Sequence, residues 1–313
     1  MARPLRIEYP GAFYHIIQRG NERKNIFVSD QDRSRFYDYL AVLHTRYKVN
    51  IHTYCIMNNH YHLILETEDA NLSSAMHYLN TSYTVYFNLK NKRSGHLFQG
   101  RYKSIIVDAD EYINQLSAYI HLNPVRAGLV KNPIDYERSS YKYFVSDNKS
   151  PDWLKTGFIL SMFDKNAKRA RSLYKEFVLR NIGSEEDDIR QNTKFGFVLG
   201  GEDFIADIKK RFIDGKDDPE IPALKATRNI MNPEKIKEAV SKKISNSKMA
   251  RKISMYLTRK YTALNLKEIA GLFDNITDAG ISILCRRVDN KRGRDKRFNE
   301  MIDGIEKLLI VET

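Results

Sequence analysis

Residues 49–66 read VNIHTYCIMNNHYHLILE, and this stretch decides the fold. Residues 49–57 and 60–66 are rich in β-branched and aromatic side chains, which favour partly buried strands. Asn58 and Asn59 lie between the two runs and suit the tight turn of a hairpin. The stretch therefore predicts two neighbouring antiparallel strands.

The segments around this hairpin predict the rest of a sheet. Residues 12–19 have a strand pattern, and residues 30–47 have a helix pattern with Asp30 as its N-cap. The later elements are a helix at 71–90, a strand at 98–107, and a helix that starts near Asp108 or Asp110 and ends at Leu122, before Asn123-Pro124. This order is that of the split βαβ, ferredoxin-like arrangement. We therefore expect an α+β fold: one antiparallel sheet with helices on one face, plus an additional helix.

The rest of the chain predicts two further regions. Helical patterns occur at 152–180 and 202–213, with linkers expected at Ser184–Asp188 and Asp214–Pro222. From Pro233 onward the sequence is helical and basic. We expect a sheet domain at residues 1–145, a helical connector at 146–230 and an all-α domain at 231–313.

The composition excludes several classes of protein. The 313 residues carry 52 Lys and Arg against 39 Asp and Glu, and the resulting charge of +13 favours a polyanionic partner, nucleic acid before membrane. Cys55 and Cys285 cannot build a disulfide framework or a cysteine zinc site, which fits a reducing cytoplasm. No stretch approaches 18 apolar residues, and the first 15 residues contain no apolar signal region. We therefore expect a cytoplasmic protein without a membrane span.

The sequence His60-Tyr61-His62 is the sharpest local feature. Side chains alternate across a strand, so His60 and His62 share one face while Tyr61 points to the other. Two such imidazoles can hold one divalent metal ion, although two surface histidines would give the same pattern. His15 and His52 also lie in predicted strands, and we expect both to be structural.

The helix ending in AYIHLNPVRAGLV (118–130) supplies a second group of polar side chains. Tyr119 and Asn123 are four residues apart and therefore share a helix face. An Asn carbonyl is a hard oxygen ligand suited to Mg²⁺ or Mn²⁺. Tyr119 beside such a site is a candidate nucleophile, and Tyr112, two turns earlier, is its rival; a half-buried aromatic is the alternative for each.

Together these motifs resemble those of a known family. The chain has H-Y-H on a strand and, some sixty residues later, Y-I-H-L-N-P-V-R-A-G-L-V; it also contains the stretches YHIIQRGNERKNIF (14–27), IMNNHYHLILE (56–66) and GHLFQGRYKS (95–104). In this order they resemble the IS200-like single-tyrosine HUH transposases, in particular the REP-associated tyrosine transposases, over about residues 1–145. The resemblance implies a ferredoxin-like palm, Mg²⁺ or Mn²⁺ on His60 and His62 with Asn123 as third ligand, and Tyr119 as nucleophile.

The resemblance also implies an activity and its partners. It implies a metal-dependent single-stranded DNA endonuclease and strand transferase that forms a 5′-phosphotyrosine intermediate at sites flanking DNA hairpins. One tyrosine per site implies either a homodimer or a monomer that acts in two rounds. Two alternatives stay open: a non-catalytic hairpin-binding regulator derived from a transposase, and a metal-dependent phosphodiesterase that activates water.

Several basic and amide side chains are candidates for contacts with DNA. Guanidinium groups and amides suit phosphates and base edges. The candidates are Arg19, Arg23 and Lys24 after the first strand, and Gln99, Arg101 and Lys103 around the strand before the tyrosine helix. Tyr14, Tyr102, Tyr141 and Tyr143 are candidates for stacking on unpaired bases.

Residues 248–288 have the spacing of a helix-turn-helix domain: a helix, a short helix, and a third helix that ends in Cys285-Arg286-Arg287. ARKISMYLTRKYT and LKEIAGLF resemble the DNA-binding domain of the replication initiator DnaA. Residues 277–280 are Thr-Asp-Ala-Gly where that family has Asp-His-Thr-Thr, so the resemblance implies double-stranded DNA binding but not the initiator's own site. Arg286 and Arg287 are the candidate phosphate contacts.

Overall fold

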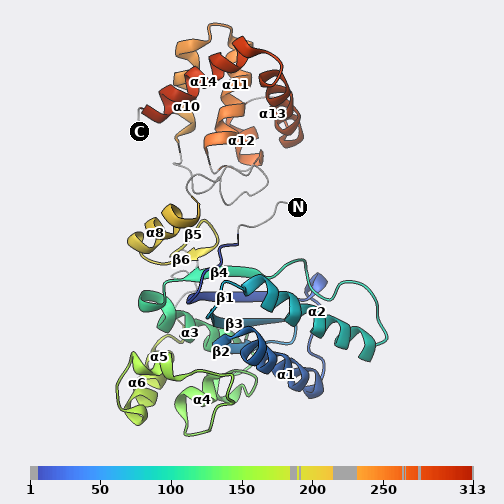
Figure 1. The fold of residues 1–313 in the computed structure, drawn as a ribbon, viewed down its shortest axis with the longest axis vertical. Coiled ribbons are helices and arrows are strands. Elements are labelled where there is room, and N and C mark those ends of the chain that lie inside the picture. Colours follow the sequence, from blue (N-terminus) through green and yellow to red (C-terminus); the bar gives the residue numbers. More distant parts are fainter. Residues whose placement is uncertain are drawn as a thin grey trace. The chain divides into compact units, whose positions relative to one another are not determined.

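Two compact units make up the chain, one at Arg6–Phe212 and the other within Ile213–Thr313. The computed structural model describes residues 6–183, 189, 192–213, 231–262, 264, 266–273 and 276–311 (Figure 1). The two linkers expected from the sequence, 184–188 and 214–222, lie outside these residues. The boundary between the units thus follows Phe212, whereas the sequence suggested a sheet domain ending at 145.

The first unit is built on a four-stranded antiparallel sheet in the order β2-β3-β1-β4. Its elements are β1 (Ala12–Arg19), a 3-10 turn (Asn21–Arg23), α1 (Asp30–Tyr47), β2 (Val49–Ile56), β3 (His60–Thr67), α2 (Leu72–Lys90), β4 (Lys103–Val107) and α3 (Ala109–Arg126). This is the ferredoxin-like order predicted from the sequence. The expected α+β fold is therefore confirmed.

The register of the sheet decides which side chains meet. Ile17 of β1 lies opposite His62 of β3 and also opposite Lys103 of β4, while Arg19 lies opposite His60. Paired residues in an antiparallel sheet point to the same face. One face therefore carries the polar side chains of three different strands.

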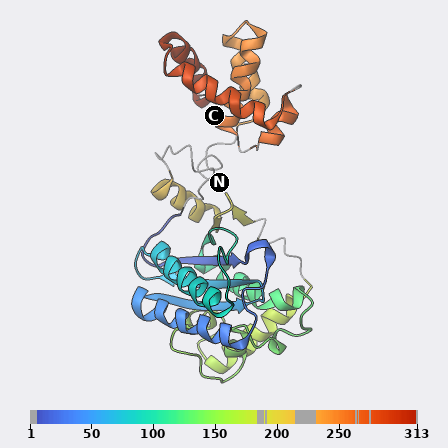
Figure 2. The same cartoon turned by 90° about the vertical axis from the view of Figure 1, so that its right-hand side faces the viewer.

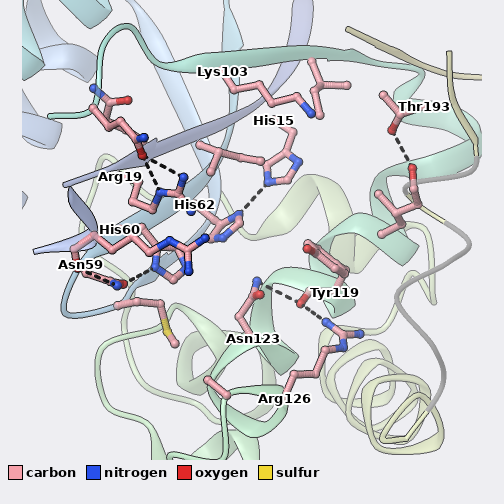
Figure 3. A pocket seen from close by; sticks show the side chains of 18 of the residues that line it. His15, Arg19, Asn59, His60, His62, Lys103, Tyr119, Asn123, Arg126 and Thr193 are labelled. Atoms are coloured by element: carbon pink, nitrogen blue, oxygen red, sulfur yellow. Dashed lines mark hydrogen bonds between the residues drawn. The ribbon is translucent and has the colours of Figure 1, made fainter. Parts of the chain in front are cut away.

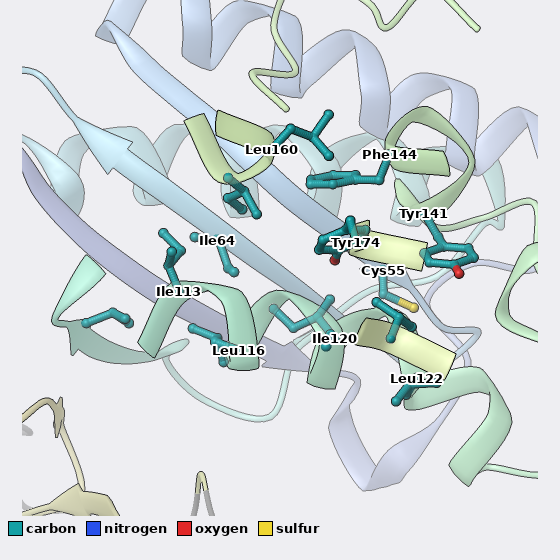
Figure 4. Packing of buried hydrophobic residues seen from close by; sticks show 14 of the residues in the cluster. Cys55, Ile64, Ile113, Leu116, Ile120, Leu122, Tyr141, Phe144, Leu160 and Tyr174 are labelled. Atoms are coloured by element: carbon teal, nitrogen blue, oxygen red, sulfur yellow. The ribbon is translucent and has the colours of Figure 1, made fainter. Parts of the chain in front are cut away.

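Helices cover both faces of this sheet (Figures 1 and 2). On one face α1 and α2 pack on β1 and β3, where the Phe36 and Tyr61 rings lie 4.8 Å apart and Tyr14 is fully buried. On the other face α3 packs its apolar side on Ile64 (Figure 4), in a buried cluster that also contains Val107. The additional helix expected from the sequence is α3, and it lies opposite the other two.

Residues beyond α3 pack onto the same unit. The short 3-10 helix Pro133–Asp135, α4 (Tyr141–Val145), α5 (Gly157–Ser161) and α6 (Ala167–Arg180) are followed by β5 (Thr193–Lys194), β6 (Val198–Leu199) and α8 (Glu202–Phe212). Tyr174 of α6 is fully buried, and its hydroxyl is 2.7 Å from both Ser117 Oγ and His121 Nδ1 of α3. β6 pairs parallel to β4 and extends the sheet. The described part of the expected connector is therefore integral to the sheet unit.

Three element ends differ from the sequence prediction. The N-cap of α1 is Ser29 rather than Asp30, because Ser29 and Asp32 exchange hydrogen bonds in a capping box. β4 begins at Lys103, not at 98. α3 runs through Pro124 to Arg126 instead of ending at Leu122.

The second unit is entirely helical in its described residues. It contains α10 (Pro233–Lys243), α11 (Ser247–Tyr261), α12 (Leu266–Leu272), α13 (Asp278–Arg292) and α14 (Lys296–Val311). Fully buried side chains from all five helices form its core: Val240, Leu257, Ile269, Ile281 and Ile302. Among the described residues of either unit, no helix is both long and apolar enough to cross a membrane.

Ile64→Ala is expected to destabilise the first unit, because Ile64 is fully buried between β3 and α3. The change should lower the free energy of unfolding by about 2–5 kcal/mol. Denaturant unfolding followed by circular dichroism measures it. The control Leu89→Ala alters a side chain that is 76% exposed and should change stability by less than about 0.5 kcal/mol; equal losses would contradict the packing described.

Candidate active site

A cavity of about 890 Å³ lies where β1 ends, where β3 and β4 begin, and beside the second half of α3 (Figure 3). Its lining includes His15, Gln18, Arg19, Arg23, Asn59, His60, His62, Gln99, Arg101, Lys103, Tyr119, Asn123, Arg126, Ile189, Thr193 and Gly196. Every metal or catalytic residue predicted from the sequence lies in this lining. The structure thus brings together side chains of β3 and α3 that are as far apart in the sequence as His60 and Asn123.

His60 and His62 of β3 both face the cavity, with ring centroids 5.1 Å apart. Burial, together with the nearby Arg19, lowers the pKa of His60 to about 4. Burial, with His15 and His60 as neighbours, holds the pKa of His62 well below its usual value. Both imidazoles are therefore neutral near pH 7, which is the form that binds metal ions.

The Asn59 side chain fixes the orientation of the His60 ring. Its amide nitrogen donates to the carbonyl of Arg23 at 3.2 Å, so its oxygen is the atom that faces His60. His60 Nδ1 donates to that oxygen at 2.6 Å. The proton of His60 is thereby placed on Nδ1, and Nε2 is left as the ring atom that can bind a ligand.

The backbone around this contact leaves no room for a side chain at Gly20. A Cβ at Gly20 would lie 2.1 Å from the carbonyl oxygen of Lys24, and the Gly20 N–H donates to the carbonyl of Asn59 at 2.8 Å. Glycine is needed here for close approach of the backbone. It lets the loop after β1 rest directly on the turn that precedes His60.

His15 belongs to the cavity, although its place in a predicted strand suggests a structural role. Its Nε2 lies 3.0 Å from His62 Nδ1, and burial together with Lys103 lowers its pKa to about 3. The pairing of β1 with β3 produces this contact, and no local spacing in the sequence signals it. His52 is structural, as predicted: it bonds to Glu66 and to the carbonyl of Lys155, outside the cavity lining.

The ring of Tyr119, on α3, faces the rings of His62 and His15. Its ring centroid lies 6.3 Å from those of both His62 and His15 in edge-on geometry. The guanidinium carbon of Arg126 lies 4.7 Å from the centre of the Tyr119 ring, and Arg126 donates to the Tyr119 carbonyl at 2.8 Å. Tyr112, the rival candidate, is absent from the cavity lining. Arg126 was missed in the sequence, although it follows Tyr119 by seven residues and so shares its side of the helix.

Asn123 allows α3 to continue through Pro124. Proline has no N–H to give to the carbonyl of Ile120, and the Asn123 amide nitrogen donates there instead, at 3.3 Å, and also to the carbonyl of Tyr119 at 3.3 Å. The amide oxygen is the opposite end of this group. Asn123 therefore both maintains the helix and can offer an oxygen ligand at the cavity.

Cationic side chains dominate the cavity wall. Arg19, Arg23, Arg101, Lys103 and Arg126 line it, and no carboxylate does so among the residues that the structure describes. The oxygen of Gln99 accepts two hydrogen bonds from Arg19, at 2.8 and 3.1 Å. Such a surface suits a phosphate backbone.

Some of the residues predicted to contact DNA lie outside the cavity. Lys24 is exposed, pairs with Glu22 at 2.7 Å and is absent from the cavity lining. The expectation that Tyr14, Tyr102 and Tyr141 stack on bases is wrong, because at most 5% of each residue is exposed and they belong to the core. Tyr143 is half-buried and stays a prediction.

Arg286 and Arg287 lie in the second unit, on α13. Both are exposed, while their neighbours Cys285 and Val288 are buried in the helical core. Arg292, in the last turn of α13, instead bonds to Asp303 at 2.5 Å and to Glu306 at 3.0 Å. Arg286 and Arg287 therefore face outward from α13, whereas Arg292 serves the internal packing of the unit.

The chain is similar to proteins described as transposases and, over a shorter stretch, to a replication initiator. Residues 9–123 match the family model described as IS200-like transposase. The chain is 28% identical over 148 residues to a protein of Haemophilus influenzae described as a REP-associated tyrosine transposase. The alignment covers 41% of this chain and 84% of that protein. A solved structure described as a REP-associated tyrosine transposase bound to a REP hairpin covers 50% of this chain and 92% of its own, with a TM-score of 0.41 and 20% identity.

A further similarity concerns a replication initiator. Over 67 residues the chain is 38% identical to the chromosomal replication initiator protein DnaA of Thermodesulfovibrio yellowstonii. The matched segment is 21% of this chain and spans only 15% of the length of that protein.

Asn123→Ala is expected to destabilise the first unit by about 1 kcal/mol, because it leaves the Ile120 carbonyl without a donor. In the background Pro124→Ala, residue 124 regains an N–H, so the same change should cost about 0.5–1 kcal/mol less. Denaturant unfolding of the four proteins of this double-mutant cycle measures the difference. An equal cost in both backgrounds would contradict the role assigned to the Asn123 nitrogen.

Proposed function

We propose that this chain, whose residues 9–123 form an IS200-like transposase domain, cuts and rejoins single-stranded DNA through a covalent link to Tyr119. One observation carries this proposal: a single cation-lined cavity holds the His60–His62 pair and the Tyr119 ring together. DNA hairpins with single-stranded flanks are the proposed substrate, as the family resemblance implies. The match to the IS200-like family supports a transposase, and the chemistry of the residues that line the cavity supports the proposed reaction.

The donor atoms of the cavity fit Mg²⁺ or Mn²⁺. The set consists of two neutral imidazoles and one amide oxygen, from His60, His62 and Asn123. Among the described residues there is no group of three or more His, Cys, Asp or Glu side chains suited to a metal ion. When bound here, such an ion would neutralise charge on a phosphate and orient it.

The other residues of the cavity have separate tasks in the proposed reaction. Arg19, Arg101 and Lys103 bind the phosphates on either side of the scissile one. Tyr119 attacks the phosphorus atom in line, and its phenolic proton leaves to solvent; the bond from phosphorus to the 3′ oxygen breaks, and this oxygen takes up a proton from water. The products are a 5′-phosphotyrosine link and a 3′-OH. Arg126 holds the Tyr119 ring and carbonyl in place during the attack.

The reverse reaction joins strands without an energy source. Cleavage replaces one phosphodiester bond of the DNA by one phosphotyrosine bond, so the bond energy is conserved. A 3′-OH can therefore attack the phosphotyrosine link and release Tyr119. If the 3′-OH belongs to another strand, the result is strand transfer. With one tyrosine per cavity, two cleavages require either two subunits or two successive rounds.

A denaturant-resistant protein–DNA adduct is the expected product when the full chain is incubated with Mn²⁺ and a labelled hairpin that has single-stranded flanks. Tyr119→Phe should abolish the adduct, because no phenolic oxygen remains to bond to phosphorus. Tyr112→Phe is the matched control and should keep it, since Tyr112 is absent from the cavity lining. His60→Ala should lose cleavage while binding the hairpin within a few-fold of the wild type.

Each other outcome of this assay points to a different mechanism. An adduct formed by Tyr119→Phe would mean that another residue is the nucleophile. Cleavage without any adduct would favour a phosphodiesterase that activates water. Binding without cleavage by the wild type would favour a regulator that holds hairpins and has no catalytic role.

A second activity is proposed for the helical unit: binding of double-stranded DNA through α13. The exposed Arg286 and Arg287 project from this helix, and its first turn is capped by Thr277, whose hydroxyl accepts from the Gly280 N–H at 3.1 Å. α13 packs on α11 and α12, the three-helix set that the sequence predicts to be a helix-turn-helix. The likeness to a replication initiator supports the same activity.

Replacing Arg286 and Arg287 together by Ala should weaken double-stranded DNA binding and flatten its salt dependence. Each lost phosphate contact lowers the slope of log K against log salt by about 0.9, so the double variant should lose up to about 2. Fluorescence anisotropy between low and moderate salt measures this slope. Lys242→Ala/Lys243→Ala on α10 removes the same charge as a control; if both variants behave alike, α13 is not the DNA-binding helix.

A further inference from the structure

His15 and His62 form a pair of buried imidazoles on one face of the sheet (Figure 3). They are 2% and 5% exposed, and their rings stack at 24° with centroids 5.2 Å apart. His15 Nε2 and His62 Nδ1 are 3.0 Å apart. At this distance one nitrogen donates a hydrogen bond and the other accepts it.

We propose that His15 is a positioning residue that accepts this hydrogen bond and thereby holds His62 with its Nε2 toward the cavity. The inference rests on the proposed metal site of His60 and His62. An imidazole that binds a metal through Nε2 carries its hydrogen on Nδ1, and that N–H needs an acceptor. His15 Nε2 lies 3.0 Å from His62 Nδ1, at the distance and position from which it can accept this hydrogen bond.

The neighbouring histidine has the same arrangement with a different partner. His60 Nδ1 donates to the amide oxygen of Asn59 at 2.6 Å, and the Asn59 amide is itself fixed by Arg23. Each candidate ligand therefore has its Nδ1 engaged, so that Nε2 is the atom left for a metal ion. Asn59 and His15 are different kinds of side chain, yet each engages the Nδ1 atom of one candidate ligand. This shared arrangement fits a common role in orienting the two rings for a metal ion.

His15 itself is suited to orient a ligand rather than to act as one. Its Nε2 is directed at His62, and its Nδ1 is buried without a hydrogen-bond partner. Its backbone is fixed in the sheet opposite Ile64 and Ile105. Because an unpartnered buried polar atom destabilises a fold, its presence beside the cavity fits a functional role.

The test measures Mn²⁺ binding to the full chain without DNA, from the loss of the free Mn²⁺ signal in electron paramagnetic resonance. His15→Leu removes the acceptor and should weaken Mn²⁺ affinity about 10- to 100-fold, the usual effect of losing a partner of a metal-binding histidine. His15→Gln can still accept through its side-chain oxygen and should restore affinity to within a few-fold. His52→Leu removes another buried histidine of the same sheet and should leave affinity unchanged.

Two variants separate this inference from the proposed function. If the wild type does not bind Mn²⁺, or if His60→Ala binds it equally well, the proposed metal site is wrong and the role of His15 is overturned with it. If His60→Ala loses Mn²⁺ while His15→Leu keeps it, only the role of His15 is overturned. If His15→Gln is as weak as His15→Leu, or His52→Leu is equally weak, the acceptor role is contradicted; circular dichroism confirms folding of each variant.

Discussion

The alternation of side chains along β3 is the constraint on which the rest of the structure depends. Tyr61 is fully buried against Phe36 and donates its hydroxyl to Asn80, which anchors one face of the strand in the core beneath α1 and α2. His60 and His62 must then face the side of α3. A register slip of one residue would place both imidazoles in the apolar core and Tyr61 in the cavity, so the packing of the sheet protects the site.

On α3, too, structure and site are linked, because side chains of the site also stabilise the helix. Asn123 supplies the hydrogen bond that Pro124 cannot make, and Arg126 bonds to the carbonyl of Tyr119 while lying over its ring. These contacts set the position of Tyr119 relative to His62. Folding and chemistry therefore share residues, and a change at one of them affects both stability and the proposed reaction.

Much of the fold and the centre of the site could be predicted because they depend on the local periods of strands and helices, which can be read from the sequence. The strand period places His60 with His62, and the helix period places Tyr119 with Asn123. His15 depends instead on the pairing of β1 with β3, which no local pattern encodes. The strands β5 and β6 have two residues each, too few for any periodicity, so the contribution of Thr193 to the cavity was also missed. The burial of Tyr14, likewise, follows from tertiary packing rather than from residue type.

Anomalous X-ray scattering from a Mn²⁺-soaked crystal of the full chain tests the central claim most directly, because it locates the metal without reference to activity. We expect one strong peak in the cavity, within bonding distance of the Nε2 atoms of His60 and His62 and beside Asn123, with Tyr119 facing it. A peak bound through the Nδ1 atoms, or at another place on the protein with this cavity empty, would contradict it.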